Sequence, residues 1–224
     1  MRRTLALLLL VLPLAACGAG DVTSLDPVAQ AADKTADAAG AHFTLDARIT
    51  ALGETVAVSG TGELADHGRK LHMRLTLPMA SAPTEAVAAD GSFYIRGGPV
   101  DSLANGKWVR VKADGRSFDL GQSDPTKLLD YLRATSNVEK RGTATIRGVV
   151  TTHYVAHVKP DQKQGLKQAV PLDVWVDGQG FVRRMRVDVP QAQATMDLFD
   201  FGDVNVAVPA ASETTDLSTM LGGG

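Results

Sequence analysis

The feature that most constrains the fold is a hydrophobic alternation of period two that recurs along the chain. In its first run Phe43, Leu45 and Ile49 alternate with polar residues. Successive side chains of a β-strand point to opposite faces, so each run predicts a strand with one apolar and one wetted face. The clearest runs cover 43–50, 56–64, 71–77, 149–158, 172–177 and 181–189.

Short turn sequences separate these runs. Asp66-His67-Gly68 and Asp177-Gly178-Gln179-Gly180 each stand between two alternating segments. Turns of this length join neighbouring antiparallel strands, so the chain predicts a long meander of about ten or eleven strands. In the run after the second turn, Arg183 interrupts the apolar face, and we expect it at an exposed strand end.

Helix signals interrupt the meander. Asp26-Pro27 supplies an N-cap and a proline in the first turn, and the helix should end at Ala39 before Gly40. Asp124-Pro125 opens a second helix, to about Ala134, and a third is expected in the polar stretch 160–168. Together they predict an α+β fold with one large antiparallel sheet, which either closes into a barrel or stays open with an apolar concave face.

The N-terminus predicts export and lipidation. Arg2 and Arg3 precede an apolar run too short to span a bilayer, and Leu14-Ala15-Ala16-Cys17 follows. These four residues resemble the lipobox of bacterial lipoproteins, in which the Cys is lipidated and becomes the first mature residue. The alternative is an ordinary Cys17 beside a simple secretory cleavage site. We expect a signal peptide at 1–16 and a lipidated tether at 17–25.

The amino-acid composition limits the classes of partner that the chain is expected to bind. The net charge is −2, and basic residues are scattered, so nucleic acid is not an expected partner. Cys17 is the only cysteine, so no disulfide framework forms. Aromatic residues make up only 5% of the chain, which predicts an aliphatic interior. Such an interior suits acyl chains, but an ordinary filled core explains it equally well.

Catalytic and metal-binding patterns are lacking in the sequence. No Gly-x-Ser-x-Gly elbow or phosphate loop is found, so we expect no enzyme and no cofactor. His153 and His157 lie on a predicted strand, where residues four apart are about 13 Å apart, too far for one metal ion. The pairs Asp173/Asp177 and Asp197/Asp200 are interpreted as solvated carboxylates on strand faces.

Several motifs in order resemble the actinobacterial LppX/LprA/LprF/LprG lipoprotein family and, more distantly, the carriers LolA and LolB. The motifs are the lipobox at Cys17, Asp26-Pro27, Gly106-Lys107-Trp108-Val109, Asp124-Pro125, the strand 148–154, and the hairpin 174–180 followed by Arg183 and Arg184. The resemblance implies a half-barrel of about 10–11 strands in residues 26–209, with two or three helices covering its concave face. Residues 210–224 would be a flexible tail.

The resemblance also implies a function. Members of this family hold acyl chains of lipids or lipoglycans between sheet and helices and help to carry them through the cell envelope. The chain would then sit on the outer face of the cell membrane, with an envelope lipid transporter as a further candidate partner. The residues expected to line the cavity are Leu71, Met73, Leu75, Leu77, Leu128, Leu129, Leu132, Met185 and Val187. Two alternatives remain: a filled core at these positions, and an anchored interaction module with a protein partner.

Overall fold

A single twelve-stranded sheet dominates the protein. The computed structural model describes residues 26–51, 53–78, 80, 82–112, 129, 132–133, 135–158 and 169–216. The strands are β1 (Gly40–Ala51), β2 (Glu54–Ala65), β3 (Lys70–Thr76), β4 (Thr84–Ala89), β5 (Ser92–Arg96), β6 (Trp108–Lys112), β7 (Thr135–Ile146), β8 (Val149–Val158), β9 (Val170–Asp177), β10 (Val182–Val189), β11 (Ala192–Phe199) and β12 (Thr214–Asp216). Their order is β12-β6-β5-β4-β3-β2-β1-β11-β10-β9-β8-β7.

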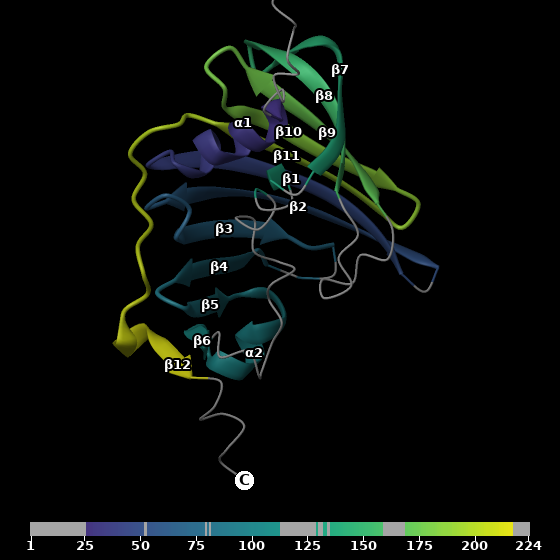
Figure 1. Cartoon of the computed structure of the whole chain (residues 1–224). Coiled ribbons are helices and arrows are strands. Elements are labelled where there is room, and N and C mark those ends of the chain that lie inside the picture. The colour runs from purple at the N-terminus through teal and green to yellow at the C-terminus, as the bar shows by residue number, and fades with distance from the viewer. Residues whose placement is uncertain are drawn as a thin grey trace, which may run out of the picture.

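The sheet is curved and open. Neighbouring strands are antiparallel throughout, apart from the parallel pair β12 and β6. β12 and β7 form the two edges and do not pair with each other. Figure 1 shows the resulting half-barrel, with helix α1 (Pro27–Ala36) on its concave side. The expected large, curved antiparallel sheet is therefore confirmed.

Helix α1 forms where its capping sequence predicts. The Asp26 carboxylate accepts hydrogen bonds from the backbone N–H groups of Val28 and Ala29, at 2.8 and 3.2 Å, and Pro27 occupies the first turn. The helix ends at Ala36, three residues earlier than expected. Its buried face consists of small side chains, which lets it approach the sheet closely: Val28, Ala31, Ala32 and Thr35.

The expected two or three helices are not borne out. In the described part of the chain, α1 is the one helix longer than a single turn; α2 (Asp101–Ala104) has four residues and follows the 3-10 turn Gly98–Val100. The helix predicted from Asp124 lies outside the described residues except at 129, 132 and 133, and the stretch 160–168 lies wholly outside them.

Two strands escaped the sequence analysis, and each lacks a clear apolar alternation. β7 contains Glu139-Lys140-Arg141 and two irregularities of register, between Ser136 and Glu139 and between Lys140 and Gly142. β12 has three polar residues and belongs to the segment assigned to a flexible tail from residue 210. Because β12 pairs with β6, the folded domain extends at least to Asp216, beyond the expected boundary at 209.

The C-terminal segment after β11, residues 200–216, is called the strap. It runs along one side of the half-barrel and brings β12 to the edge of β6 (Figure 1). Two strap residues, Val204 and Val206, pack on a cluster on the convex face that comprises Ala65, Val87, Ala89, Tyr94 and Trp108. At its end Arg110 donates two hydrogen bonds of 2.6 Å to the Asp216 carboxylate. The strap thus covers part of the convex face and protects one sheet edge.

Candidate ligand-binding face

Residues that pair across neighbouring strands form rows on the concave face of the sheet, and these rows are largely apolar. The strand register places Phe43 opposite Leu198 on one side and Gly62 on the other, and this row continues through Met73, Ala86, Ile95 and Val109. The next row starts at Ala41 and continues through Leu64, Leu71, Ala88, Phe93 and Val111. A third row centred on Leu45 includes Gly60, Leu75, Thr84, Met196, Met185, Val174 and Tyr154. Across these three rows, only Thr84 and Tyr154 carry a polar group.

Two glycines make room for larger side chains on this face. A Cβ atom on Gly62 would lie 2.4 Å from Cζ of Phe43, and one on Gly60 would lie 2.6 Å from Cδ2 of Leu75. Both separations are shorter than carbon atoms allow, so the Phe43 and Leu75 side chains lie directly over the glycine backbone. The side chains of Phe43 and Leu75 therefore lie flat along the concave face.

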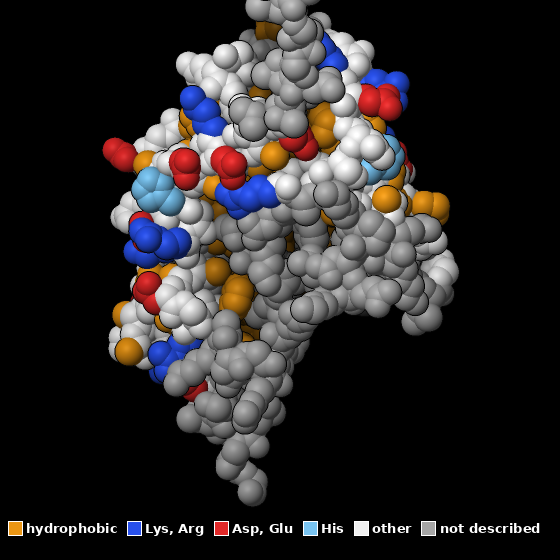
Figure 2. Space-filling model, in the orientation of Figure 1, with side chains coloured by type: hydrophobic (Ala, Val, Ile, Leu, Met, Phe, Trp, Pro, Cys, Tyr) orange, Lys and Arg blue, Asp and Glu red, His pale blue; other side chains and the backbone are white. Residues whose placement is uncertain are grey.

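The two halves of the concave face differ in burial. Around α1 and strands β8 to β11 the interior is filled: Phe43, Leu132, Val174 and Leu198 are nearly inaccessible to solvent. On strands β3 to β5 the corresponding side chains are only half-buried, namely Met73, Leu75, Ala86, Ala88, Phe93 and Ile95. In Figure 2, apolar side chains show between charged ones on this side of the molecule. Within the described chain, the part of the concave face farther from α1 is less completely covered.

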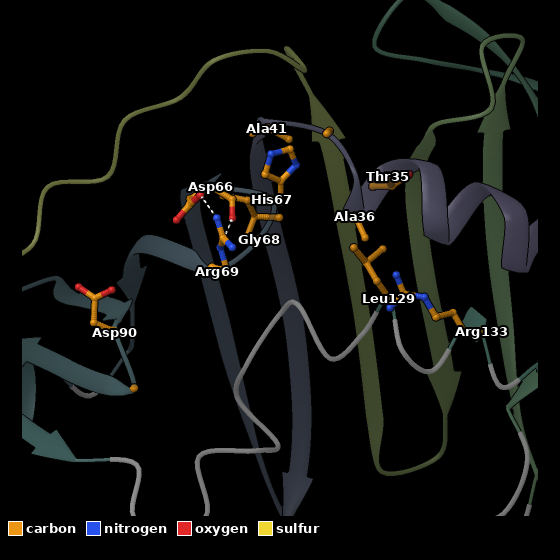
Figure 3. Close-up of a pocket in the computed structure, with 14 residues that line it drawn as sticks. Thr35, Ala36, Ala41, Asp66, His67, Gly68, Arg69, Asp90, Leu129 and Arg133 are labelled. Atoms are coloured by element: carbon orange, nitrogen blue, oxygen red, sulfur yellow. Dashed lines mark hydrogen bonds and ion pairs between the residues drawn. The ribbon is translucent and has the colours of Figure 1, made fainter.

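A pocket of about 790 Å³ opens at one end of the concave face. Ala41 and Leu64 from the sheet and Leu129 contribute apolar surface. Figure 3 shows polar side chains around it, with Arg69 on the β2–β3 turn and Arg133 beside Leu129. The volume lies within the range of ordinary small-molecule sites, roughly 300–1,000 Å³.

The polar side chains around the pocket are held by neighbours. Arg69 pairs with the Asp66 carboxylate, and this contact lowers the pKa of Asp66 and raises that of Arg69. The ring Nδ1 of His67 lies 2.9 Å from the backbone carbonyl of Asp37, which can only accept, so Nδ1 carries the proton. Nε of Arg133 donates to Asp33 at 2.7 Å. The contact of His67 with Asp37 ties the β2–β3 turn to the end of α1.

A second pocket of about 540 Å³ is less suited to hydrocarbon. Polar residues of the convex face supply much of its lining, among them Asp46, Ser59 and Thr195. An acyl chain in this pocket would strip water from these polar groups without replacing their hydrogen bonds, which is unfavourable. The first pocket and the concave rows therefore form the candidate site.

The predicted lining residues on β3 and β10, namely Leu71, Met73, Leu75, Met185 and Val187, lie on the concave side. Leu71 is only 2% exposed, and Leu129, Leu132 and Met185 are likewise buried in one core cluster. Met73 and Val187 are partly buried against this cluster. Leu75 on β3 and Leu77 directly after it are half-buried. Leu128 and Cys17 lie outside the described residues.

Three polar residues were assigned wrongly from the sequence. Asp177 and Asp197 are buried, so they are not solvated carboxylates on strand faces. Asp177 accepts hydrogen bonds from the backbone N–H groups of Gln179 and Phe181 and from Nε of Arg183, which closes the β9–β10 turn. Arg183 follows a register shift after Val182 and is mostly buried in this ion pair, so it does not mark an exposed strand end.

The polar residues around the first pocket were missed by sequence reasoning. Asp66, His67 and Arg69 belong to a turn that the sequence did predict, but a turn motif carries no signal for a pocket. The left-handed backbone of Asp66 and His67, with φ of 54° and 56°, brings this turn toward the end of α1. That approach depends on tertiary contacts thirty residues apart in the chain, so local patterning cannot reveal it.

The described residues lack both a metal-ligand cluster and a membrane-spanning helix. They contain no group of three or more His, Cys, Asp or Glu side chains that could share a metal ion. His153 instead contacts Asp173 at 2.6 Å and stacks on Trp175 with ring centroids 4.4 Å apart. None of the helices formed by these residues has the length and apolarity that crossing a bilayer requires.

Comparisons with known proteins agree with the sheet architecture. No protein-family model matches the chain, and no curated protein sequence matches it. Among solved structures, the lipoprotein LppX of Mycobacterium tuberculosis superposes with a TM-score of 0.61 at 16% identity, over 84% of this chain and 100% of that one. LprF of Mycobacterium bovis superposes with a TM-score of 0.54 at 15% identity, over 82% and 94%. At such identities the likeness shows a shared fold, and the fold expected from the sequence motifs is confirmed.

Proposed function

Since the chain has the LppX/LprF-like half-barrel fold, we propose that it is a lipid-binding lipoprotein of the cell envelope. Lipid on Cys17 would hold it on the outer face of the cell membrane. Acyl chains of lipids or lipoglycans would lie on the concave face and be carried toward other envelope layers, with an envelope lipid transporter as a partner. Binding and transfer need no bond-making step, so the proposal contains no catalytic residue.

The observation that carries this proposal is the aliphatic concave face, which the described residues cover only in part. Moving an acyl chain from hydrocarbon into water costs about 0.8 kcal/mol of free energy for each CH₂, so a carrier must offer a continuous apolar surface. Neighbouring strands are about 4.8 Å apart, so the row from Phe43 on β1 to Val109 on β6 spans roughly 24 Å. One leaflet of a bilayer has hydrocarbon about 15 Å thick. The row is therefore as long as a full acyl chain, but Phe43 and Val109 at its ends are already buried. The part that a ligand would cover is its half-buried middle, Met73, Ala86 and Ile95 on β3 to β5.

The burial difference supports the position of the ligand. The side chains on β8 to β11 already pack against α1, which leaves little surface for a ligand there. Met73, Leu75 and Ala86 are half-buried and lie one or two rows away from Ala41 and Leu64, which line the 790 Å³ pocket. In the proposed complex the acyl chain covers these residues, and the polar end of the lipid lies near Arg69 and Arg133.

A substitution pair on two strands tests the proposal. Ala86 is half-buried on the concave face, whereas Ala57 is exposed and lies opposite Arg48 on the convex side. We expect Ala86→Trp to weaken binding of a fluorescent polyene fatty acid at least five-fold and Ala57→Trp to leave it unchanged. Leu75→Gln should also weaken binding, since it places an unpaired amide on the path of the chain.

The controls separate folding from binding. Circular dichroism and thermal unfolding of each variant show whether the sheet is retained. Equal affinity of wild type, Ala86→Trp and Leu75→Gln in folded proteins would contradict binding on the concave face. Failure of the wild type to bind any fatty acid would contradict the proposed function itself.

A further inference from the structure

The β1–β2 hairpin extends past its neighbours. β1 and β2 pair along their whole length, up to Ala51 and Glu54. β3 pairs with β2 only from Ser59 to Ala65, so no described strand pairs with residues 54–58 on that side. Figure 1 shows this hairpin projecting beyond the ends of strands β3 to β5. Residues 48–51 and 53–58 are called the hairpin end.

An exposed apolar side chain lies on the hairpin end. In the described residues, three large hydrophobic side chains are exposed: Ile49, Val150 and Val208. Ile49 is 50% exposed and pairs with the half-buried Val56. Both residues belong to the concave side, since they continue the alternation of Phe43 and Leu45 along β1 and its partners on β2. The hairpin end therefore continues the proposed lipid path to the outside.

Asp26, where the described chain begins, lies beside the same end of the strands. Ile49 lies opposite Ala192 on β11, and Ala192 lies opposite Val189 on β10. On the next strands this end carries Val170 of β9, which lies opposite Val158 of β8. Val158 in turn lies opposite Thr135 of β7. Asp26, the first described residue, accepts a hydrogen bond of 3.0 Å from the Thr135 hydroxyl.

The reach of the tether limits where the membrane can be. Nine residue steps separate Cys17 from Asp26, and a fully extended chain covers at most about 3.6 Å per step, or roughly 32 Å. A lipid on Cys17 therefore keeps Asp26 within this distance of the bilayer surface. Five strand spacings, about 24 Å, separate Thr135 on β7 from Ile49 on β1, so this reach allows the hairpin end to touch the bilayer.

From this placement we propose that the hairpin end docks on the lipid bilayer and inserts Ile49 among the acyl chains. The inference rests on the proposed anchoring at Cys17. One apolar side chain is too small to hold a protein on a membrane alone, but the anchor makes the contact intramolecular and so raises its effective concentration. An acyl chain could then pass from the bilayer along Ile49 and Val56 to the concave face without crossing water.

The charges on the hairpin end favour an apolar contact over an electrostatic one. Arg48 and Glu54 are both exposed there and are opposite in sign. A surface without net charge gains little from anionic lipids. Docking should therefore occur on zwitterionic phosphatidylcholine vesicles and should persist when the salt concentration is raised.

Cysteine labelling tests the docking directly. Cys17 is the only cysteine and is consumed by the lipid, so a single introduced cysteine can be labelled with the environment-sensitive dye NBD. The variants are Ile49→Cys and Val150→Cys in the lipidated mature chain on phosphatidylcholine vesicles. Val150 is a matched control, since it is 68% exposed and lies next to the β7–β8 turn, at the opposite end of β8 from Val158.

We expect NBD at residue 49 to shift its emission to shorter wavelength on vesicles and to be quenched by brominated lipids. NBD at residue 150 should show neither effect. No shift at 49, or equal shifts at both positions, would overturn the proposal. The result is independent of ligand binding, so it can fail while the proposed function stands.

A second arm measures transfer. Ile49→Asp should slow the uptake of a fluorescent fatty acid from vesicles several-fold, whereas Val150→Asp should not. Binding of the same fatty acid added from vesicle-free solution should be equal in both variants and the wild type. Unchanged uptake in Ile49→Asp would contradict the docking role, and loss of solution binding in all three proteins would contradict the proposed function instead.

Discussion

The phenyl ring of Phe43 lies directly over the backbone of Gly62 on the neighbouring strand. A Cβ atom at residue 62 would come within 2.4 Å of both Cζ of Phe43 and the backbone oxygen of His72. Overpacking of this kind costs about 1–3 kcal/mol. We expect Gly62→Ala to lower the free energy of unfolding by that amount in urea titrations. Gly202→Ala, where no atom lies within 4 Å of an added Cβ, should change it little.

Asp177 should be among the costliest carboxylates to remove. Its side chain is 2% exposed and accepts hydrogen bonds from Arg183 and from two backbone N–H groups of the β9–β10 turn. Removing one partner of a buried ion pair leaves the other charge without compensation. Asp177→Ala should destabilise the fold by about 3 kcal/mol in denaturant titrations. Asp173→Ala, which breaks a more exposed contact with His153, should cost less than about 1 kcal/mol.

Glu85 should make stability depend on acid pH. Hydrogen bonds from Arg96 and then Arg74 lower the pKa of this carboxyl in the folded state. A folded-state pKa below the unfolded value of about 4.3 adds stability above that pH, and this contribution disappears as the pH falls through the folded-state pKa. Glu85→Gln should therefore lower the melting temperature at pH 7 and flatten its decline between about pH 5 and pH 3. An unchanged profile would contradict this role.

The strap should depend on the contact between Arg110 and Asp216. The two hydrogen bonds of 2.6 Å hold β12 on the edge of β6, and the pair raises the pKa of Arg110, which stays charged. Asp216→Asn should speed hydrogen exchange in β12 and at the β6 edge, with little loss of global stability, because the pair is largely solvated. Exchange in β8 and β9 should not change. Equal exchange in wild type and variant would contradict this role of the ion pair.

Much of the sheet was predictable because its chemistry is local. Ten of the twelve strands follow from apolar alternation between short turns, and the strand expected at 149–158 has those bounds. The capping pair Asp26-Pro27 likewise located the start of α1. β7 was missed because two irregularities and a charged triplet interrupt its alternation. β12 was missed because three polar residues form a strand only against the edge of β6, which the sequence does not display.

The residues of the candidate site were predictable from the sequence, but how deeply each side chain is buried was not. Period-two patterning placed Met73 and Leu75 on the apolar face, where the structure has them. It could not tell that Leu71 and Met185 are buried in a filled region while Met73 and Leu75 stay half-buried, because that difference depends on where α1 lies across the sheet. The wrong assignment of Asp177 has the same origin, since its burial follows from packing around the β9–β10 turn.

The central claim is that the concave face holds an acyl chain. Native mass spectrometry of the Cys17→Ser chain, incubated with a total lipid extract and then freed of unbound lipid, tests it most directly. The account predicts mass increments of one lipid per protein that are reduced in Ala86→Trp and retained in Ala57→Trp. A spectrum of the wild-type fold with no lipid adduct, at lipid concentrations that saturate other lipid carriers, would contradict it.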